Sequence, residues 1–357
     1  MPAEKSKTFF ALLNIKNEHI FKEHGILSWG MLKYHGFNSF LATYNNGSYH
    51  NLKYLQGLKM NFIPKVTGRW GIDSVLWLMK NAGKIDVLFV YHIGIMPFAQ
   101  VFTYKLFNPE GKVYLKLDGR PLPVHGGKLK RPLYRWLMRH SDCVSTELED
   151  NTELLSREWK RKIICVPNPA NPSELLEYRP FSRRSNVIAY AGRIEHEKGS
   201  LTLLEAFSRI KHKIPDWTLK LMGSVLMDKE ILEKFKSEQI VFTGEIRDRA
   251  ELIEAYRDAK IFAFPSRHES FGIALSEAVM QGDFSVVTKI PSSRYLTDNY
   301  SFALSSDVDN VDGLADNLLY ACTHEEEAER LAIEGMNVLR ERLDLERCCN
   351  LIADEIK

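Results

Sequence analysis

The chain has 357 residues, which exceeds the size of a typical single core and therefore favours two domains. Its 45% hydrophobic and 26% charged residues exclude a largely disordered chain. The net charge is only +2, but residues 1–170 carry 24 Lys and Arg against 13 Asp and Glu, whereas residues 171–357 carry 24 against 33, so the basic first half predicts an anionic partner.

The sequence shows no segment that would cross a membrane. No apolar run approaches the roughly 18 residues that a spanning helix needs, and the apolar core of the N-terminus is too short for a signal peptide. The five cysteines lack the spacing of a zinc site or a disulfide framework. We therefore expect a cytoplasmic protein with buried or partly buried free thiols.

The first half alternates strands with helices. Segments with helical spacing include residues 26–36 and 74–84. Short β-rich runs are predicted at residues 9–15, 37–44, 86–92, 112–118, 143–146 and 163–168. Such alternation predicts an α/β fold with a parallel sheet and helices on both of its faces.

Residues 126–140, GGKLKRPLYRWLMRH, form a basic segment with interleaved aromatic residues. A basic amphipathic helix suits an anionic membrane surface, and ordinary solvation with core packing is the alternative. Nucleic acid is not indicated, because no binding motif is present in the basic half. The cations concerned are Lys128, Lys130, Arg131, Arg135 and Arg139.

A domain boundary is predicted near residues 165–185, where Pro167, Pro169, Pro172 and Pro180 interrupt any regular element. The charge also changes sign there. We therefore expect domains at residues 1–170 and 171–340. Residues 341–357 form a C-terminal helix that is expected to pack back on the first domain.

The second half repeats the alternation. Residues 325–357 predict a packing layer of helices with breaks at Gly335 and at Leu343–Asp344. Helical spacing also occurs at residues 202–213, 227–238, 248–260 and 273–282. Strands are predicted at residues 186–193, 217–223, 239–245, 260–266 and 284–290.

The segment NVIAYAGRIEHEKGSLTLLEAF, from residue 186, runs from a strand through Gly192 and Gly199 into a helix. A helix N-terminus after a glycine-containing turn favours an anion site, which Arg193 and Lys198 would complete. The loop is neither a Walker loop nor a dinucleotide fingerprint. The alternative is a solvated connection whose charges face water.

The segment PSRHESFGIALSEAVMQG, residues 265–282, carries two glutamates. Glu269 is predicted in the loop, and Glu277 in a helix that begins at Ser270 or Phe271. Gly272 would allow close approach to the helix N-terminus, and Gly282 would follow its C-terminus. The alternative is that both glutamates are surface charges.

Together these two segments resemble the retaining glycosyltransferases of glycosyltransferase family 4, which have the GT-B fold. The family's context PS-x-x-E-x-FG-x-x-x-x-E-A-x-x-x-G is met at every fixed position from Pro265 to Gly282. The resemblance extends over the second half and back to VPNP at the boundary. It implies two Rossmann-like parallel-sheet domains facing across a cleft, the first binding an acceptor and the second binding a nucleotide-sugar donor.

The resemblance also implies roles for single residues of the second half. Glu277 would bind the ribose hydroxyls, and Glu269 would contact the sugar ring as part of the catalytic site. Arg193 and Lys198 would neutralise the diphosphate and serve catalysis as well as binding, so that neither a metal nor another cofactor is needed. Thr243 and Gly244 would lie near the nucleobase, and the remaining donor-binding groups would be backbone N–H groups of Phe271, Gly272, Ile273 and Ala274.

The first half departs from the family pattern. Family members often carry a histidine after the strand that precedes the boundary, whereas KVYLKLDGRP offers Asp118. Asp118 is therefore the first choice for the catalytic residue of this half, with His92 and His125 as reserves. The family's glycine-rich loop after the first strand is replaced by NIKNEHIFKEHG, so acceptor recognition is not carried over.

The expected function is transfer of a sugar, with retention, from a nucleotide diphosphate sugar to an acceptor hydroxyl in polysaccharide, glycolipid or other glycoconjugate synthesis. The acceptor class stays open between a glycan, a lipid-linked molecule and a protein. The alternatives are a nucleotide-sugar epimerase or phosphorylase on the same fold, and a non-catalytic nucleotide-sugar-binding subunit. A lipid-linked acceptor would place the protein peripherally on the inner face of the membrane.

Overall fold

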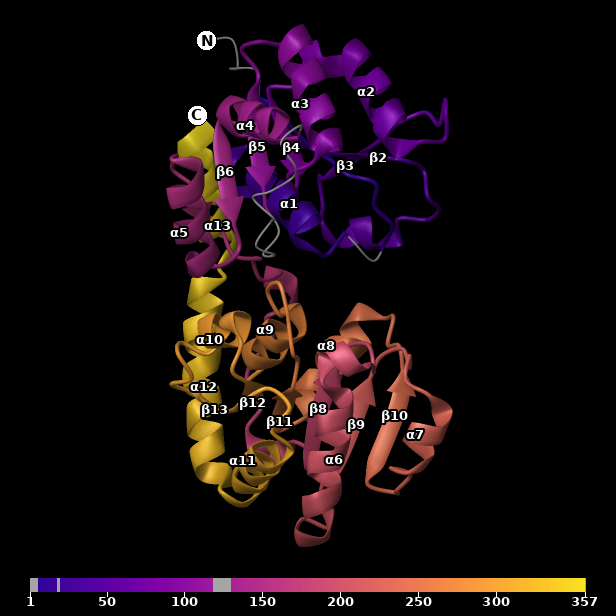
Figure 1. Cartoon of the computed structure of the whole chain (residues 1–357), viewed down its shortest axis with the longest axis vertical. Helices are drawn as coiled ribbons and strands as arrows, with labels where there is room; N and C mark the ends of the chain where they lie inside the picture. Colours follow the sequence, from indigo (N-terminus) through magenta and orange to yellow (C-terminus); the bar gives the residue numbers. More distant parts are fainter. Residues whose placement is uncertain (1–5, 18–19, 118–129, 357) are drawn as a thin grey trace. The chain divides into compact units, whose positions relative to one another are not determined.

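The computed structural model describes residues 6–17, 20–117 and 130–356. The chain divides into two compact units, which are Met1–Asn171 with Leu343–Lys357 (unit 1) and Pro172–Arg342 (unit 2). The division falls within the proline-rich segment (Figure 1). Each unit is built on one parallel sheet, so the α/β class predicted from the alternation of strands and helices is confirmed.

Unit 1 has a seven-stranded sheet with the order β3-β2-β1-β4-β5-β6-β7, in which all neighbouring strands are parallel. The strands are β1 (Thr8–Leu12), β2 (Asn38–Thr43), β3 (Lys59–Phe62), β4 (Val87–Tyr91), β5 (Lys112–Lys116), β6 (Cys143–Thr146) and β7 (Ile164–Cys165). The helices are α1 (Glu23–His35), α2 (Trp70–Asn81), α3 (Ile95–Phe107), α4 (Arg131–His140), α5 (Glu149–Trp159) and α13 (Leu345–Ile356).

The two faces of this sheet have separate cores, because successive strand residues point to opposite faces. Phe9 belongs to the core that contains residues of α1 and α13. Phe10 belongs to the core that contains residues of α2, α3, α4 and α5. Helices α2, α3 and α4 also contact one another in that order, so they form one layer over one face of the sheet (Figure 1).

Unit 2 has a six-stranded parallel sheet with the order β10-β9-β8-β11-β12-β13. The strands are β8 (Val187–Ala191), β9 (Thr218–Met222), β10 (Ile240–Gly244), β11 (Ile261–Phe264), β12 (Phe284–Thr288) and β13 (Ala303–Ser306). The helices are α6 (Ser200–Ile210), α7 (Lys229–Glu233), α8 (Arg249–Asp258), α9 (Ile273–Met280), α10 (Pro291–Leu296), α11 (Val311–Thr323) and α12 (Glu325–Arg342).

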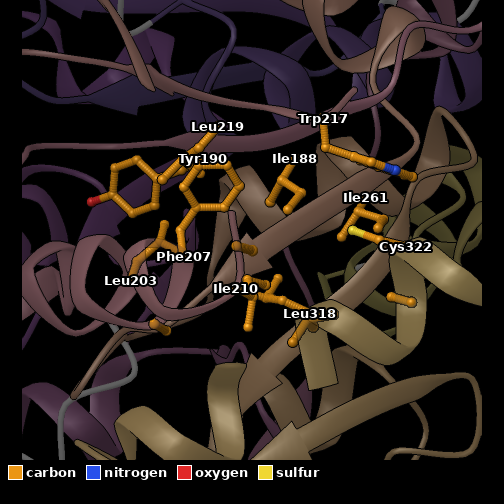
Figure 2. Packing of buried hydrophobic residues seen from close by; sticks show 14 of the residues in the cluster. Ile188, Tyr190, Leu203, Phe207, Ile210, Trp217, Leu219, Ile261, Leu318 and Cys322 are labelled. Atoms are coloured by element: carbon orange, nitrogen blue, oxygen red, sulfur yellow. The ribbon is translucent and has the colours of Figure 1, made fainter. Parts of the chain in front are cut away.

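The core of unit 2 fixes β8 against α6. Ile188 and Tyr190 of β8 pack with Leu203 and Phe207 of α6, and all four are buried (Figure 2). Leu318 of α11 belongs to the same cluster. The strand and the helix that flank the Gly192–Gly199 loop are therefore held on both sides by packed side chains, which limits how far that loop can move.

The C-terminal helices correct one expectation. Helix α12 runs through Gly335 without a break. A Cβ atom at this position would lie 2.5 Å from the Phe302 ring, so the glycine serves close packing rather than a helix end. The break expected at Leu343–Asp344 is confirmed, and α13 then packs against α1 within unit 1. Gly30 permits that contact, because a Cβ there would lie 2.4 Å from Cys349 Sγ.

Candidate active site

The carboxyl ends of β8 and β11 carry the two loops that the sequence singles out. In the loop after β8, the Glu195 backbone N–H donates to Ser200 Oγ, and this hydroxyl donates in turn to the Glu195 carbonyl, both at 2.8 Å. The loop after β11 is tied to it, because the Arg267 N–H donates to the Glu197 carbonyl at 3.1 Å. The N-terminus of α6 and the segment before α9 are thus joined at one edge of the sheet, where open α/β sheets bind their ligands.

Gly199 makes this close approach possible. It precedes α6 with a φ of 65°, and a Cβ atom there would lie 1.9 Å from the carbonyl oxygen of Pro265. Only glycine combines that backbone conformation with the space available. The glycine therefore sets the distance between the two loops.

A substitution at Gly199 tests this role. We expect Gly199→Ala to lower the free energy of unfolding by about 2 kcal/mol or more, since it adds a clash to the cost of about 1 kcal/mol for a left-handed alanine. Gly36→Ala is the matched control, because Gly36 has a φ of 67° and a Cβ atom there would have nothing within 4 Å. Equal losses for the two variants in urea unfolding would contradict the close approach.

Lys198 and Glu269 meet between the two loops. Lys198 Nζ donates to Glu269 Oε1, and the side chains keep only 19% and 22% of their exposure. The opposite charges are thus partly shielded from water, which strengthens their interaction. Arg193 lies on the same loop but is more open, with 58% exposure, and its guanidinium contacts Glu195 Oε1 at 2.9 Å.

Helix α9 begins at Ile273, later than the start expected at Ser270 or Phe271. The reason is Gly272, whose φ of 92° is not helical and which therefore caps the helix. The N–H groups of the first turn have no acceptor within the helix, and they carry the positive end of its dipole. Glu269 lies in the loop and Glu277 within the helix, as predicted, and Gly282 follows its end with a φ of 83°.

Glu277 belongs to a charged cluster that the sequence did not reveal. Arg249, the first residue of α8, contacts Glu277 Oε1 at 2.5 Å and Glu174 at 2.7 and 2.8 Å. Tyr256 donates to Glu277 Oε2 at 3.4 Å. Burial raises the pKa of Glu277, the Arg249 guanidinium opposes that effect, and the negative charge of Glu174 adds to it. These contacts still leave acceptor positions on Glu277, since a carboxylate has about four lone-pair sites.

Thr243 and Gly244 end β10 at the same edge of the sheet. The Thr243 hydroxyl is exposed and donates to the Gly244 carbonyl at 3.0 Å. The Gly223 N–H, which follows β9, also donates to that carbonyl, at 2.8 Å. A Cβ at Gly223 would lie 1.9 Å from the Gly192 carbonyl, so the ends of β8, β9 and β10 lie side by side. The structure therefore gathers all the candidates of unit 2 along one edge.

Of the three candidate residues of unit 1, the structure describes only His92. Asp118 and His125 lie outside the described residues. His92 is exposed directly after β4, with a φ of 62°, and its N–H donates to the Lys116 carbonyl at 2.9 Å. It therefore lies at the carboxyl edge of the unit 1 sheet.

A buried charged cluster around Lys116 lies at this edge, and the sequence analysis did not predict it. Lys116 ends β5 with 1% exposure, and its Nζ donates to the Val166 carbonyl at 2.8 Å. Burial opposes the charge of Glu23, but the nearby His24 and Lys116 hold its pKa at about 2. Burial, with Glu23 nearby, raises the pKa of Tyr91 at the end of β4. No spacing signal connects these residues, because they come from different strands and helices.

The described residues show neither a metal-binding cluster nor a membrane-spanning helix. Residues 6–17, 20–117 and 130–356 contain no group of three or more His, Cys, Asp or Glu side chains arranged to hold a metal ion. In the same part of the chain, no helix has the length and hydropathy needed to span a membrane. All five cysteines are free, and Cys165 is the one that is only partly buried.

Residues 176–338 match the family model of the glycosyl transferases group 1. The chain is 28% identical over 301 residues to 2-deoxystreptamine N-acetyl-D-glucosaminyltransferase of Niallia circulans, which covers 74% of this chain and 75% of that relative. It is 25% identical over 201 residues to the glycogen synthase of Mycobacterium tuberculosis H37Rv, covering 53% of this chain but only 48% of the relative. The matched residues lie within unit 2, so the similarity to the group 1 glycosyl transferases is located in that unit.

Solved structures are similar over almost the whole chain. A glycosyltransferase from Rickettsia africae ESF-5 has a TM-score of 0.79 at 14% identity, covering 99% of this chain and 98% of that one. The Anabaena protein Alr3699/HepE in complex with UDP-glucose has a TM-score of 0.72 at 14% identity, with 98% of each chain covered. Together with the two parallel sheets, these similarities confirm the GT-B fold class predicted from the sequence.

Proposed function

We propose that the protein transfers a glycosyl group from a nucleotide diphosphate sugar to an acceptor hydroxyl, with retention at the anomeric carbon and without a metal ion. The observation that carries the proposal is the contact of Lys198 with Glu269 between two loops that Gly199 holds together. This contact places a cation, a carboxylate and the N-terminus of α9 on one edge of the sheet. Such a site suits a diphosphate attached to a sugar.

In this proposal, each residue of the site binds a different part of the donor. Lys198 and Arg193 bind the diphosphate, and the backbone N–H groups from Phe271 to Ala274, just before and at the start of α9, add donors. Glu269 accepts hydrogen bonds from the sugar, and Glu277 accepts them from the ribose hydroxyls. Thr243 and Gly244 lie by the base. The cations stabilise the charge that develops on the leaving diphosphate, so their contribution is largest in the transition state.

The reaction that we propose balances without a further reactant. The bond from the anomeric carbon to the diphosphate oxygen breaks, and the acceptor oxygen forms its bond on the same face of the sugar. The proton of the acceptor hydroxyl passes to the departing diphosphate. Support for a nucleotide-sugar donor comes from the relatives, one of which is an N-acetyl-D-glucosaminyltransferase, and from the Anabaena structure with UDP-glucose.

We assign acceptor binding to unit 1. Asp118 is the proposed residue nearest the donor sugar, with His92 and His125 in reserve. The acceptor is a glycan, a lipid-linked molecule or a protein, and its product belongs to polysaccharide, glycolipid or another glycoconjugate. A peripheral position on an anionic membrane through residues 126–140 is part of the same proposal.

A donor panel tests the function. We expect one of the UDP-, GDP-, ADP- and dTDP-sugars to raise the unfolding temperature, since a ligand at about 100 times its Kd adds roughly 2.7 kcal/mol of stability. The best binder is then assayed for turnover, with the anomeric configuration of the product read by NMR and with EDTA present throughout. No shift with any donor would count against the site, and inversion or loss of activity in EDTA would count against the proposed mechanism.

The products distinguish the alternatives. An epimerase would release the epimeric nucleotide sugar, and a phosphorylase would release a sugar phosphate when phosphate is supplied. A non-catalytic subunit would show the thermal shift without turnover for any acceptor. The proposed transferase is expected to release the nucleoside diphosphate in proportion to the glycosylated acceptor.

A further inference from the structure

Helix α4 presents three arginines along one side. Arg131, Arg135 and Arg139 are spaced four residues apart, which places them on one strip of the helix. All three are exposed. Among the residues that the structure describes, no carboxylate lies within ion-pair distance of any of them or of Lys160, which is also exposed. Like charges on one strip repel each other, so a bound anion would stabilise this arrangement.

These side chains line a cavity of about 880 Å³ in unit 1. Lys160, Arg161 and Lys162, from the segment between α5 and β7, complete a set of six cations on its wall. The wall also includes Asp142, which directly precedes β6, so the cavity reaches the amino end of that strand. It is therefore a site apart from His92 and the carboxyl edge of this sheet.

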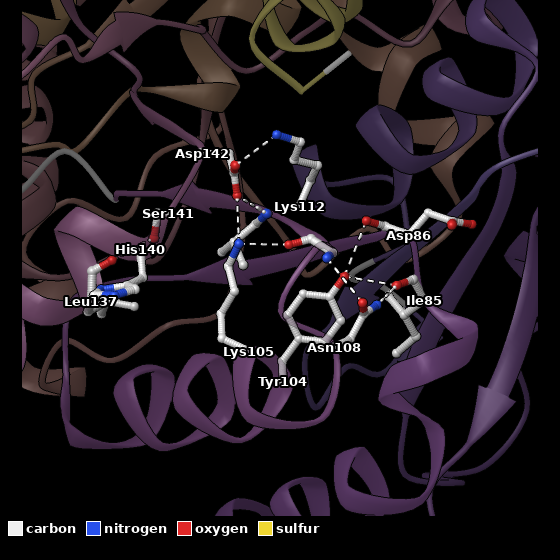
Figure 3. A network of polar contacts seen from close by, with 12 residues as sticks. Ile85, Asp86, Tyr104, Lys105, Asn108, Lys112, Leu137, His140, Ser141 and Asp142 are labelled. Atoms are coloured by element: carbon white, nitrogen blue, oxygen red, sulfur yellow. Dashed lines mark hydrogen bonds and ion pairs between the residues drawn. The ribbon is translucent and has the colours of Figure 1, made fainter.

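Two of the three acids on the wall already have partners. Asp142 accepts from Lys105 and Lys112, each at 3.2 Å, and from the Val113 N–H at 2.9 Å (Figure 3). Glu355 is paired with Lys162. Only Glu158 is left among the acids on this wall, against Arg131, Arg135, Arg139 and Lys160. Among the described residues, the cavity thus keeps more positive than negative charge on its wall.

An apolar surface adjoins α4. Ile72, Leu76 and Met79 on α2 are 43%, 37% and 47% exposed at helical spacing, and Phe102 and Leu106 on α3 are 45% and 63% exposed. The three helices form one layer over the sheet, and the Phe102 ring lies 5.4 Å from that of Trp136 on α4. Exposed apolar side chains gathered on neighbouring helices mark an interaction surface rather than scattered exposure.

We propose that this layer docks on a membrane surface that contains anionic phospholipid. The cavity beside α4 binds lipid phosphate groups, and the apolar side chains of α2 and α3 enter the boundary between headgroups and acyl chains. The arginines that lack a carboxylate partner among the described residues can pair with lipid phosphates. The neighbouring apolar surface favours a lipid over a soluble phosphate compound, because only a lipid also offers acyl chains. The proposal rests on the peripheral membrane position proposed above for residues 126–140 and names the groups that would make the contact. It does not depend on the donor site, because all of these residues belong to unit 1.

Vesicle flotation of the full chain tests the docking. We expect the protein to float with vesicles of phosphatidylcholine and phosphatidylglycerol but not with phosphatidylcholine alone, and to be released as salt is raised. Replacing the three arginines (Arg131→Gln, Arg135→Gln and Arg139→Gln) is expected to weaken binding on the order of 100-fold, since each basic residue at an anionic surface contributes about fivefold. The matched control replaces Lys211, Lys213 and Lys234 of unit 2 by Gln and is expected to bind like the parent protein.

A second pair of variants tests the apolar contact. Leu76→Gln with Leu106→Gln is expected to weaken binding at least about tenfold, whereas Leu154→Gln with Leu351→Gln, two other exposed leucines of unit 1, is not. Unchanged unfolding temperatures would show that every variant is folded. Equal binding to neutral vesicles, binding of inorganic phosphate at the arginines without vesicle binding, or a dimer in solution that the Leu76 and Leu106 changes dissociate would each overturn the proposal.

Discussion

Lys198→Ala is expected to lower turnover by about 100-fold to 1000-fold, while the affinity for the donor falls much less. The reason is that charge on the diphosphate grows as its bond to the sugar breaks, so a cation aimed at it contributes most in the transition state. The loss of one such preorganised donor costs about 2.7–4 kcal/mol in other enzymes. In this chain the contact with Glu269 already holds the ammonium group in a partly buried position.

Two variants control this experiment. Lys198→Arg keeps the charge and should recover part of the lost turnover, whereas Lys213→Ala removes an exposed lysine of the same unit and should have no effect. The measurements are kcat and KM for the donor, together with the thermal shift that the donor produces. A large rise in KM with kcat unchanged would mean that Lys198 only binds the ground state, and the catalytic role would then be wrong.

The sequence predicted those features of the fold and site that depend on residues close together in the chain. Gly272 and Pro265 frame a short loop, so the positions of Glu269 in that loop and Glu277 in the helix could be predicted before any contact was known. The two sheets could be predicted in the same way, because each strand and its following helix are local patterns of hydrophobicity. The sequence shows the positions of the glycines. The reason for a glycine at positions 199 and 335 follows only from the structure, which shows the atoms that a Cβ there would approach.

The rest depends on residues that are distant in the chain. Glu174, Arg249 and Glu277 meet only because the fold brings three separate segments together. Lys116 is read from the sequence as one more strand residue, yet it is almost completely buried. Strand β3 is a short segment at the sheet edge, and α3 carries Pro97 in its first turn, where a proline is tolerated, so neither has a clear pattern of its own.

Glu277→Gln is expected to weaken nucleotide binding about tenfold or more, with little change in turnover at saturating donor. The carboxylate is an acceptor for two ribose hydroxyls in the proposed site, and hydrogen bonds to a charged group contribute about 1.5–3 kcal/mol. The amide keeps the shape but offers one acceptor and one donor group. Arg249 retains its bidentate pair with Glu174 in this variant, so the fold around it should persist.

The pH dependence makes the test specific to this carboxyl group. Because burial raises the pKa of Glu277 above its ordinary value of 4.5, donor binding should weaken as the pH falls through that raised pKa. The stability of the free protein should change in the opposite sense. The folded state binds the additional proton, so the contribution of this group to the free energy of unfolding is present at low pH and is lost as the pH rises through the folded pKa.

Glu277→Gln should abolish both the pH dependence of donor binding and this group's contribution to the pH dependence of stability, since it removes the titrating group. Tyr256→Phe is the matched control, because it deletes the other contact to Glu277 at 3.4 Å and leaves the acid in place. Isothermal titration of the best donor and urea unfolding, each from pH 5 to pH 8, measure the two effects. If the Gln variant kept the pH dependence of binding, a different acid would have to contact the nucleotide, and the assignment of Glu277 to the ribose would fail.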